Sequence, residues 1–211
     1  TWPPKWLLSE FSYFLIRILL YKIGRSRIKN FDLLISIYKL QFPNYKMNSQ
    51  KKSSFIFKIV VTILICELTG IISSIISMPS MYPWFSEIQK PSWNPPSTIV
   101  APVWTTLYLL MGISLALVWK KDVGTGQEEA KQNAMLWFAL QLFLNFWWSI
   151  VFFKFHSLSI SLVVIVLMVV SIIITIFKFA PFSKVASWLL IPYISWVCFA
   201  SILNFTIWQL N

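Results

Sequence analysis

Five long apolar segments, separated by short polar ones, follow one another along most of the chain. They cover about residues 55–77, 97–119, 132–153, 157–177 and 185–208. A helix needs about 20 mostly apolar residues to cross the hydrocarbon core of a bilayer, and each segment is long enough. Backbone polar groups in lipid must find partners within their own segment, so each segment is predicted to be helical. The pattern predicts an all-α membrane protein, a five-transmembrane-helix bundle embedded in the lipid bilayer.

The composition agrees with a membrane protein and excludes two other classes. Of the 211 residues, 57% are hydrophobic and 12% are charged, whereas about a quarter of the residues of a soluble domain carry charge. A disordered chain would lack this apolar content. The net charge of +11 would suggest nucleic-acid binding in a soluble domain. Here the basic residues cluster at the N-terminus and between apolar segments, so membrane orientation explains them and no nucleic-acid partner is expected.

Lysines are distributed unequally between the two sides of the predicted bundle. Those on the side of the N-terminus are Lys51, Lys52, Lys58, Lys120, Lys121, Lys131, Lys178 and Lys184. The other side holds Lys90 and Lys154. Short loops rich in lysine and arginine stay in the cytoplasm, so the N-terminal side is predicted to be cytoplasmic. A composition rich in Lys, Ile and Ser favours a bacterial plasma membrane.

Residues 1–46 form a basic N-terminal extension ahead of the membrane domain, residues 47–211. Its apolar residues recur at helical spacing: Leu7, Phe11, Phe14, Leu15 and Ile18. One interpretation is a basic amphipathic helix that lies on anionic lipid. The other is that these residues are upstream sequence outside the functional protein, because Met47 precedes a short polar stretch and the first segment as a natural start would. We favour the second interpretation.

Amides and aromatic residues share helix faces in three segments. These faces hold Trp104, Tyr108, Met111, Leu115 and Trp119; Trp137, Gln141, Asn145, Trp148 and Phe152; and Trp196, Ala200, Asn204 and Trp208. Unpaired amides are costly in hydrocarbon, so the faces are predicted to turn toward protein or a cavity. The amides either join helix to helix or belong to an indole-walled cavity for a large, flat, mostly apolar ligand. We favour the cavity because the combination recurs on three faces.

Two further expectations concern the first connection and the fourth segment. Residues 84–96 contain three prolines around Trp93, and prolines restrict the backbone on both sides. The stretch is therefore predicted to be a stiff loop. Such a loop can close a cavity, or Trp84 and Trp93 form an interfacial aromatic belt, which composition alone favours. The fourth segment has neither an amide nor a tryptophan and is expected to be the most lipid-exposed helix.

The residues that could support metal or acid–base chemistry are few. His156 is the single histidine, and the two cysteines, Cys66 and Cys198, lie inside apolar segments. They predict neither a metal site nor a disulfide framework, and no phosphate-binding glycine loop occurs. We therefore expect no metal, no cofactor and no ordinary acid–base catalysis. Glu67, the one acid within a segment, is either a helix-contact residue or part of a transport pathway.

Several motifs occur in a set order along residues 55–211. They are Lys90-Pro-Ser-Trp-Asn-Pro-Pro96, Pro102-Val-Trp104, Tyr108-Leu-Leu-Met-Gly112, Gln141-Leu-Phe-Leu-Asn-Phe-Trp-Trp-Ser149, Phe152-Phe153, Pro192-Tyr-Ile-Ser-Trp196, and the ending Trp208-Gln-Leu-Asn211. Together they resemble the TspO/MBR family, the tryptophan-rich sensory proteins related to the mitochondrial translocator protein. The resemblance implies a five-helix bundle, commonly a homodimer, that binds porphyrins and other tetrapyrroles in a cavity closed by the first loop.

The resemblance also implies which residues bind the ligand. They are Trp104, Trp196, Asn145, Trp148, Ala200 and Phe85, where Phe85 replaces a Tyr of some relatives. We expect contributions from Trp93 and Tyr108 as well, and a contact between Lys90 and a porphyrin carboxylate. The mammalian cholesterol motif has Tyr and Arg where this chain has Phe205 and Gln209, so cholesterol binding is not expected.

Three functions remain open at this point. The first is a tetrapyrrole-binding sensory or translocator protein. The second is a light-dependent porphyrin-degrading enzyme, since some bacterial members of the family are reported to degrade porphyrin, with Trp104 and Trp196 as the catalytic candidates. The third is a transporter of porphyrin or of another hydrophobic ligand.

Overall fold

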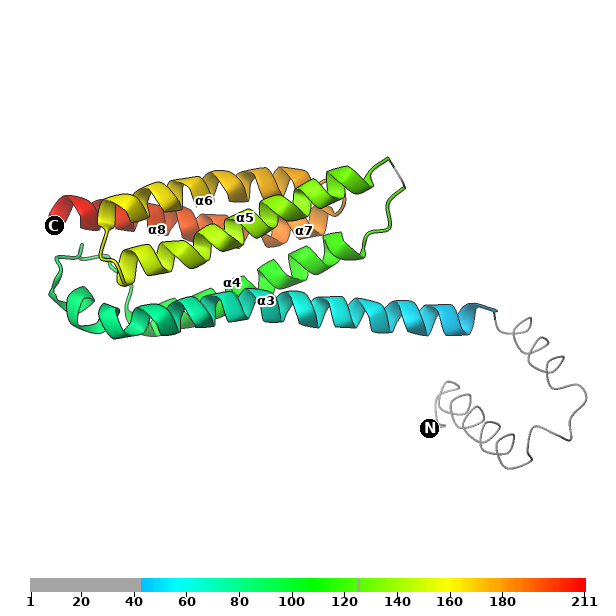
Figure 1. Ribbon diagram of the computed structural model, residues 1–211, viewed down its shortest axis with the longest axis horizontal. Coiled ribbons are helices and arrows are strands. Elements are labelled where there is room, and N and C mark those ends of the chain that lie inside the picture. The colour runs from blue at the N-terminus through cyan, green and yellow to red at the C-terminus, as the bar shows by residue number, and fades with distance from the viewer. Residues whose placement is uncertain (1–42, 125) are drawn as a thin grey trace, which may run out of the picture. The chain divides into compact units, whose positions relative to one another are not determined.

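The fold is built from α-helices. The computed structural model describes residues 43–124 and 126–211, and this part contains no strand. Its helices, labelled as in Figure 1, are α3 (Pro43–Glu87), α4 (Ser97–Lys120), α5 (Glu128–Phe153), α6 (Leu158–Phe179), α7 (Lys184–Leu189) and α8 (Ile191–Leu210). Five stretches of helix in the described residues are long and apolar enough to cross a membrane, α7 and α8 together forming the fifth. The predicted fold class is confirmed.

The bundle belongs to one compact unit of the chain. Residue contacts separate residues 1–51 from residues 52–211, and the helix packing described below is that of the second unit. The amphipathic helix predicted in residues 1–46, from Leu7 to Ile18, lies outside the described residues, and so the nature of this extension stays a prediction.

Helix α3 extends beyond the end predicted for the first segment. It passes residue 77, continues through Pro79 and Pro83, and ends at Glu87. The expectation that residues 84–87 belong to the loop was therefore wrong, and the connection to α4 is residues 88–96. A proline removes one helical hydrogen bond, but this last part of α3 is held by aromatic packing on α5: the ring centroids of Trp84 and Phe152 are 5.7 Å apart.

The fifth segment is divided into two helices. α7 ends at Leu189 and α8 begins at Ile191, with Pro192 in its first turn. The first turn of a helix tolerates proline, because the N–H that proline lacks has no partner within the helix there. Pro192 thus starts a new helix and does not kink a continuous one.

Helix α6 lies between α5 and α8, and α4 packs against α7 and α5. The buried face of α6 consists of Ser161, Ile165, Met168, Ser171, Ile172, Thr175 and Phe179. In the most apolar 18-residue stretch of α6, 33% of the residues are buried, whereas the corresponding share in α3 is 17%. The prediction that this helix is the most lipid-exposed one was wrong, because small hydroxyl side chains let its neighbours approach although no amide or tryptophan marks the face.

A glycine permits the close packing of α3 on α4. A Cβ atom added to Gly112 would lie 2.5 Å from Cα of Ile63 on α3, closer than atoms of this kind approach. The hydroxyl of Thr62 donates to the carbonyl oxygen of Gly112 at 2.8 Å. The two backbones therefore meet at this crossing, which is the packing that small residues allow between membrane helices.

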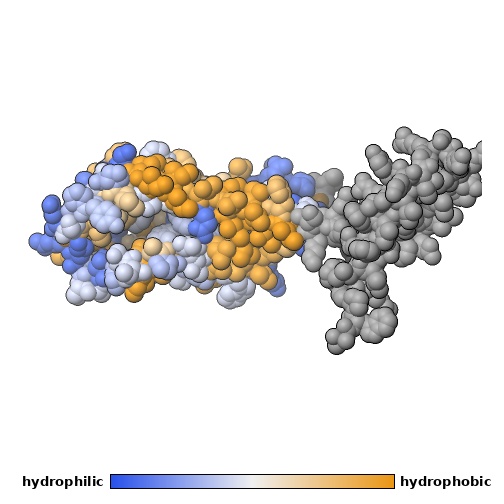
Figure 2. Space-filling view, turned by 90° about the horizontal axis from the view of Figure 1, so that it is seen from below, coloured by the Kyte–Doolittle hydropathy of each residue, from blue (hydrophilic) through white to orange (hydrophobic). Residues whose placement is uncertain are grey.

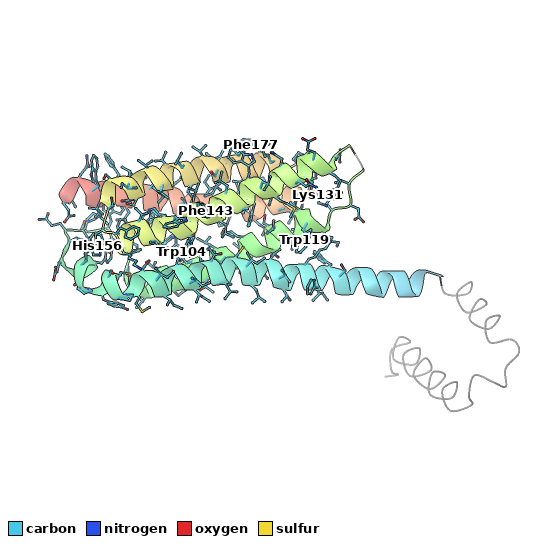
Figure 3. All side chains as sticks on the ribbon, viewed as in Figure 1. Trp104, Trp119, Lys131, Phe143, His156 and Phe177 are labelled. Atoms are coloured by element: carbon cyan, nitrogen blue, oxygen red, sulfur yellow. The ribbon has the colours of Figure 1, made fainter. Side chains whose placement is uncertain are left out.

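The two ends of the bundle carry different loops, as Figure 3 shows for Trp119 and Lys131 at one end and His156 at the other. At the first end, Nζ of Lys120 lies 3.9 Å from the ring centroid of Phe55, which places the start of the first membrane crossing beside the end of the second. Between the ends the surface has broad hydrophobic areas, and hydrophilic residues gather at the end that carries the C-terminus (Figure 2). This arrangement is expected of a bundle surrounded by lipid.

Candidate functional site

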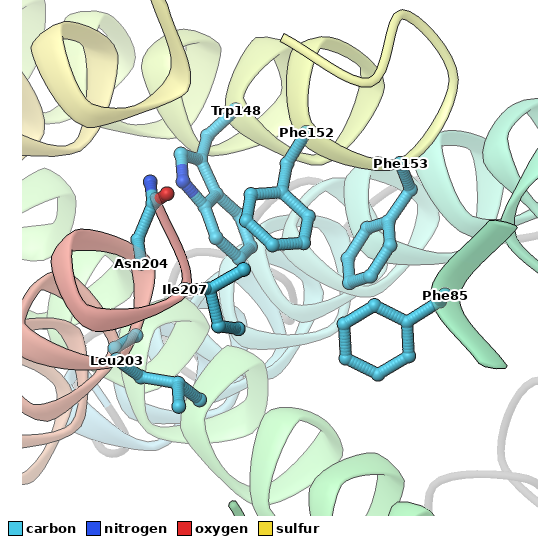
Figure 4. A pocket seen from close by; sticks show the side chains of 8 residues that line it. Phe85, Trp148, Phe152, Phe153, Leu203, Asn204 and Ile207 are labelled. Atoms are coloured by element: carbon cyan, nitrogen blue, oxygen red, sulfur yellow. The ribbon is translucent and has the colours of Figure 1, made fainter. Parts of the chain in front are cut away.

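A small apolar cavity of about 60 Å³ lies at the end of the bundle that carries the loop 88–96 (Figure 4). Helices α3, α5 and α8 wall it with Phe85, Trp148, Phe152, Phe153, Ala200, Leu203, Asn204 and Ile207. Four of these side chains are aromatic. The cavity therefore offers ring faces and edges, which suit an aromatic or aliphatic ligand.

The aromatic rings of the wall are arranged by helical spacing. Trp148 and Phe152 are one turn apart on α5, and their rings are stacked with centroids 5.4 Å apart. Phe85, at the end of α3, meets Phe153 edge to face at 5.5 Å. Figure 4 shows Phe85 beside Phe153, with Phe152 between Phe153 and Trp148. Phe85 thus closes a cavity whose other aromatic residues all lie on α5.

The end of α3 is tied to the turn between α5 and α6 by His156. The imidazole is stacked on the indole ring of Trp84, with centroids 4.4 Å apart and an angle of 12° between the planes. Its Nε2 lies 3.2 Å from the carbonyl oxygen of Ser80. His156 has a φ of 55°, the conformation of a tight turn. These contacts hold the helix end that carries Phe85.

Two residues of the loop 88–96 meet neighbouring aromatic rings. Lys90 donates from Nζ to the carbonyl oxygen of Phe85, and the same ammonium lies 4.6 Å from the Phe85 ring centroid. A cation at the C-terminal end of a helix is favourable, because the last carbonyl groups have no helical partners. Trp93 meets Phe199 of α8 edge to face at 5.8 Å. The loop is therefore anchored to both α3 and α8.

A buried hydrogen-bond network crosses the bundle next to the cavity. The Tyr108 hydroxyl donates to Oδ1 of Asn145 at 2.5 Å, and Nδ2 of Asn145 donates to the Tyr193 hydroxyl at 3.3 Å. Tyr193 in turn faces Sδ of Met168 at 3.5 Å. The network joins α4, α5, α8 and α6 through polar atoms that would be costly to leave unpaired in a membrane.

The amides that the sequence places inside the bundle are buried. Gln141, Asn145 and Asn204 are 1%, 2% and 1% exposed, which confirms that they face protein. Asn204 exchanges hydrogen bonds with Ser161 of α6 at 3.1 and 3.3 Å. Trp208 was predicted to turn inward with them, but it is 45% exposed. It lies in the last turn of α8, where an indole can sit at the membrane interface.

Three buried polar atoms have no hydrogen-bond partner among the described residues: Nε2 and Oε1 of Gln141 and Nε1 of Trp148. Trp148 lies in the cavity wall, and Figure 4 shows its indole nitrogen on the side of the ring that faces Asn204. A buried N–H without an acceptor is uncommon in a native structure. The indole N–H of Trp148 is thus an unpaired donor in the cavity wall, and it lies beneath the apolar surface of the cavity.

The structure brings some of the expected site residues to the cavity and leaves others beside it. Phe85, Trp148 and Ala200 line it. The other expected residues, which do not line it, are Trp104, Trp196, Asn145, Tyr108, Trp93 and Lys90. Trp104 is stacked on Tyr108, with centroids 5.6 Å apart, and Trp196 packs on Phe199 at 5.4 Å.

Sequence reasoning did not single out Ile207 or Tyr193. Ile207 lines the cavity and follows Leu203, another lining residue, by one turn of α8, and Ala200, an expected site residue, by two turns. Tyr193 lies inside the Pro192–Trp196 motif, and a tyrosine within a membrane segment needs a partner for its hydroxyl. That partner is Asn145, and the spacing along the chain does not identify it.

The geometry defines a class of protein: a helical membrane protein with five crossings and an aromatic cavity at one end of the bundle. Comparison with known proteins narrows it. Residues 62–209 match the model of the TspO/MBR family, and the chain belongs to this family.

Three relatives illustrate the range of similarity. The tryptophan-rich protein TspO of Chlorobaculum tepidum is 43% identical over 157 residues, which cover 74% of this chain and 97% of that protein. The protein of the same description from Archaeoglobus fulgidus is 38% identical over 156 residues, 74% of this chain and 98% of its own length. The translocator protein of Sus scrofa is 36% identical over 148 residues, 70% of this chain and 86% of that protein.

Proposed function

We propose that this protein, a tryptophan-rich sensory or translocator protein of the TspO/MBR type, binds a porphyrin or related tetrapyrrole in the cavity between α3, α5 and α8. The observation that carries the proposal is an aromatic cavity with a free indole N–H in its wall. A porphyrin is flat, largely apolar and edged with carboxylates. It would stack on the rings of Trp148 and Phe152 and accept a hydrogen bond from the indole nitrogen of Trp148.

Binding requires the cavity to open further. Its volume is about 60 Å³, whereas sites for drug-sized ligands measure about 300–1,000 Å³. All lining residues except Phe85 lie on α5 and α8. Phe85 and the loop 88–96 are therefore the parts that move aside when the ligand enters. The enlarged cavity extends down α8 from Ala200 toward Trp196, which lies one turn below.

The remaining site residues take their roles in this opened state. Trp104 and Trp196 stack on the ligand, and Asn145 with Tyr108 forms the polar floor through the hydrogen bond that already joins them. The Lys90 ammonium has three donors, so it bonds a ligand carboxylate, a charged acceptor, while it keeps its hydrogen bond to the Phe85 carbonyl. Trp93 shields the bound ligand from water.

A fluorescence titration tests this proposal. Protoporphyrin added in darkness should quench the tryptophan emission of the purified protein in a saturable way. Trp148→Phe keeps a ring but removes the free donor, so it should weaken binding about tenfold. Trp188→Phe is the matched control, because Trp188 is 71% exposed. Absence of saturable quenching would refute porphyrin binding, and equal affinities for the two variants would refute the hydrogen bond from Trp148.

The same titration under illumination separates binding from degradation. Trp104 is in ring contact with Tyr108 and Tyr193, and this cluster of oxidisable side chains favours the light-dependent enzyme as a second candidate. Quenching without any change in the porphyrin spectrum supports binding alone. A new absorbing product that disappears in Trp104→Phe supports the enzyme.

The proposal also covers a role in transport, the membrane in which the protein resides and its oligomeric state. Transport would use Glu67, which is half-buried on α3; porphyrin flux into proteoliposomes that is unaffected by Glu67→Gln would exclude that role. We propose a bacterial plasma membrane, a cytoplasmic N-terminal side and a homodimer. No metal, cofactor, nucleic acid or cholesterol is part of this proposal.

A further inference from the structure

The side chain of Asn211 connects the end of α8 to the loop 88–96. Its Oδ1 accepts a hydrogen bond from the backbone N–H of Gln89 at 2.9 Å, and its Nδ2 donates to the carbonyl oxygen of Gln89 at 3.0 Å. Nδ2 also donates to the carbonyl oxygen of Ile207 at 2.9 Å. One amide thus pairs with both polar groups of a loop residue while it caps its own helix.

These hydrogen bonds connect two walls of the cavity. Ile207 lines the cavity from α8, and Phe85 lines it from α3. Asn211 holds the carbonyl of Ile207 on one side and the backbone of Gln89 on the other, and the next residue, Lys90, bonds the carbonyl of Phe85. A continuous chain of contacts therefore runs from the α8 wall through Asn211 and the loop to the Phe85 wall.

The pairing depends on the chemistry of an amide. A carboxamide offers an acceptor and donors side by side, which matches the N–H and C=O of a peptide backbone residue. An aspartate at this position could accept from the Gln89 N–H but could not donate to the two carbonyl oxygens. The second anchor of the loop on α8, the ring contact of Trp93 with Phe199, has no such directional requirement.

We propose that Asn211 is a positioning residue of the ligand site: it fixes the loop 88–96, and with it Phe85, over the cavity and slows the release of the bound ligand. The inference rests on the proposed function. It adds a residue that does not line the cavity and acts through the loop backbone.

The test compares Asn211→Ala and Asn211→Asp with Gln209→Ala, a change at an exposed neighbour in the last turn of α8. Protoporphyrin release is followed in darkness by the recovery of tryptophan emission. Asn211→Ala should release the pigment about two- to tenfold faster, Asn211→Asp should fall between it and the unsubstituted protein, and Gln209→Ala should change nothing. The hydrogen-exchange rate of the Gln89 amide, measured without ligand, should rise in Asn211→Ala, while the midpoint of thermal unfolding stays the same.

Each other outcome counts against a different statement. Faster exchange at Gln89 with unchanged pigment release would refute the positioning role. Unchanged exchange at Gln89 would refute the hydrogen-bonded connection itself. A lowered unfolding midpoint with equal changes in association and release would assign Asn211 a merely structural role. Failure of the unsubstituted protein to bind protoporphyrin would refute the proposed function, and the exchange measurement would still decide whether Asn211 holds the loop.

Discussion

The side chain of Asn145 on α5 is hydrogen-bonded to both α4 and α8. It bonds Tyr108 on one side and Tyr193 on the other, at 2% exposure. Asn145→Ala would leave the buried Tyr108 hydroxyl without its acceptor and remove the donor to Tyr193, so we expect the free energy of unfolding to fall by about 1–3 kcal/mol. Thermal unfolding in detergent measures the loss, and Asn133→Ala, at an exposed position of the same helix, is the control. Equal stability of the two variants would contradict a structural role for the network.

Gln141, one turn away on the same helix, should behave in the opposite way. Its two amide atoms have no partner among the described residues, and the side chain is 1% exposed. Gln141→Leu keeps a similar volume and removes an unpaired polar group, so the expected change is between zero and about 1 kcal/mol of added stability. A loss comparable to that of Asn145→Ala, in the same unfolding assay, would show that the amide has a partner in the membrane.

The burial of these amides follows from the sequence, because an unpaired amide in lipid is costly wherever the chain places it. The identity of the partners does not. Asn145 and Tyr193 are 48 residues apart, and only the packing of the whole bundle decides that they meet. The same holds for the cavity: Phe85, Trp148 and Ala200 could be expected from the family resemblance, but which of the expected side chains line the cavity depends on how three helices pack.

Among the helices, the contact of α3 with α4 gives the sharpest test. A methyl group at Gly112 would overlap the backbone of Ile63, and the helices could separate only by breaking the Thr62 hydrogen bond to the Gly112 carbonyl. Gly112→Ala should therefore destabilise the protein by about 1–3 kcal/mol. Gly124→Ala is the control, since nothing lies within 4 Å of a Cβ atom at that position. An unchanged unfolding midpoint in Gly112→Ala would contradict the close crossing.

The five crossings themselves could be predicted, because an apolar segment of about 20 residues with almost no charge is long enough to cross a bilayer and can do so only as a helix. The helix ends could not. Hydropathy falls near residue 77, yet α3 continues to Glu87, because Trp84 packs against Phe152 of α5 and against His156 in the turn that follows α5. The burial of α6 was not predicted either. Its buried face carries serine and threonine in place of amides or tryptophan, and nothing in the sequence shows that other helices pack against these small residues.

At the scale of the whole molecule, the number of crossings predicts which loops lie on opposite sides of the membrane, and the lysine bias predicts which side is cytoplasmic. The loop 88–96 and the connection between α4 and α5 lie at opposite ends of the bundle, since one follows the first crossing and the other the second. Ser92 and Gln127 are exposed in these two connections. Ser92→Cys and Gln127→Cys therefore place a thiol on each side of the membrane, while the unsubstituted protein, whose Cys66 is buried and whose Cys198 lies within α8, serves as the background.

A charged maleimide that does not cross membranes, applied to intact cells that express each variant, distinguishes the possibilities. Lysine-rich loops remain in the cytoplasm, so Ser92→Cys should be labelled from outside and Gln127→Cys only after detergent is added. Labelling of both thiols from the same side would contradict the odd number of crossings between them. The reverse pattern would leave the five crossings intact and contradict the orientation alone, and it would place the aromatic cavity and its loop on the cytoplasmic side, where a pigment would have to reach it from within the cell.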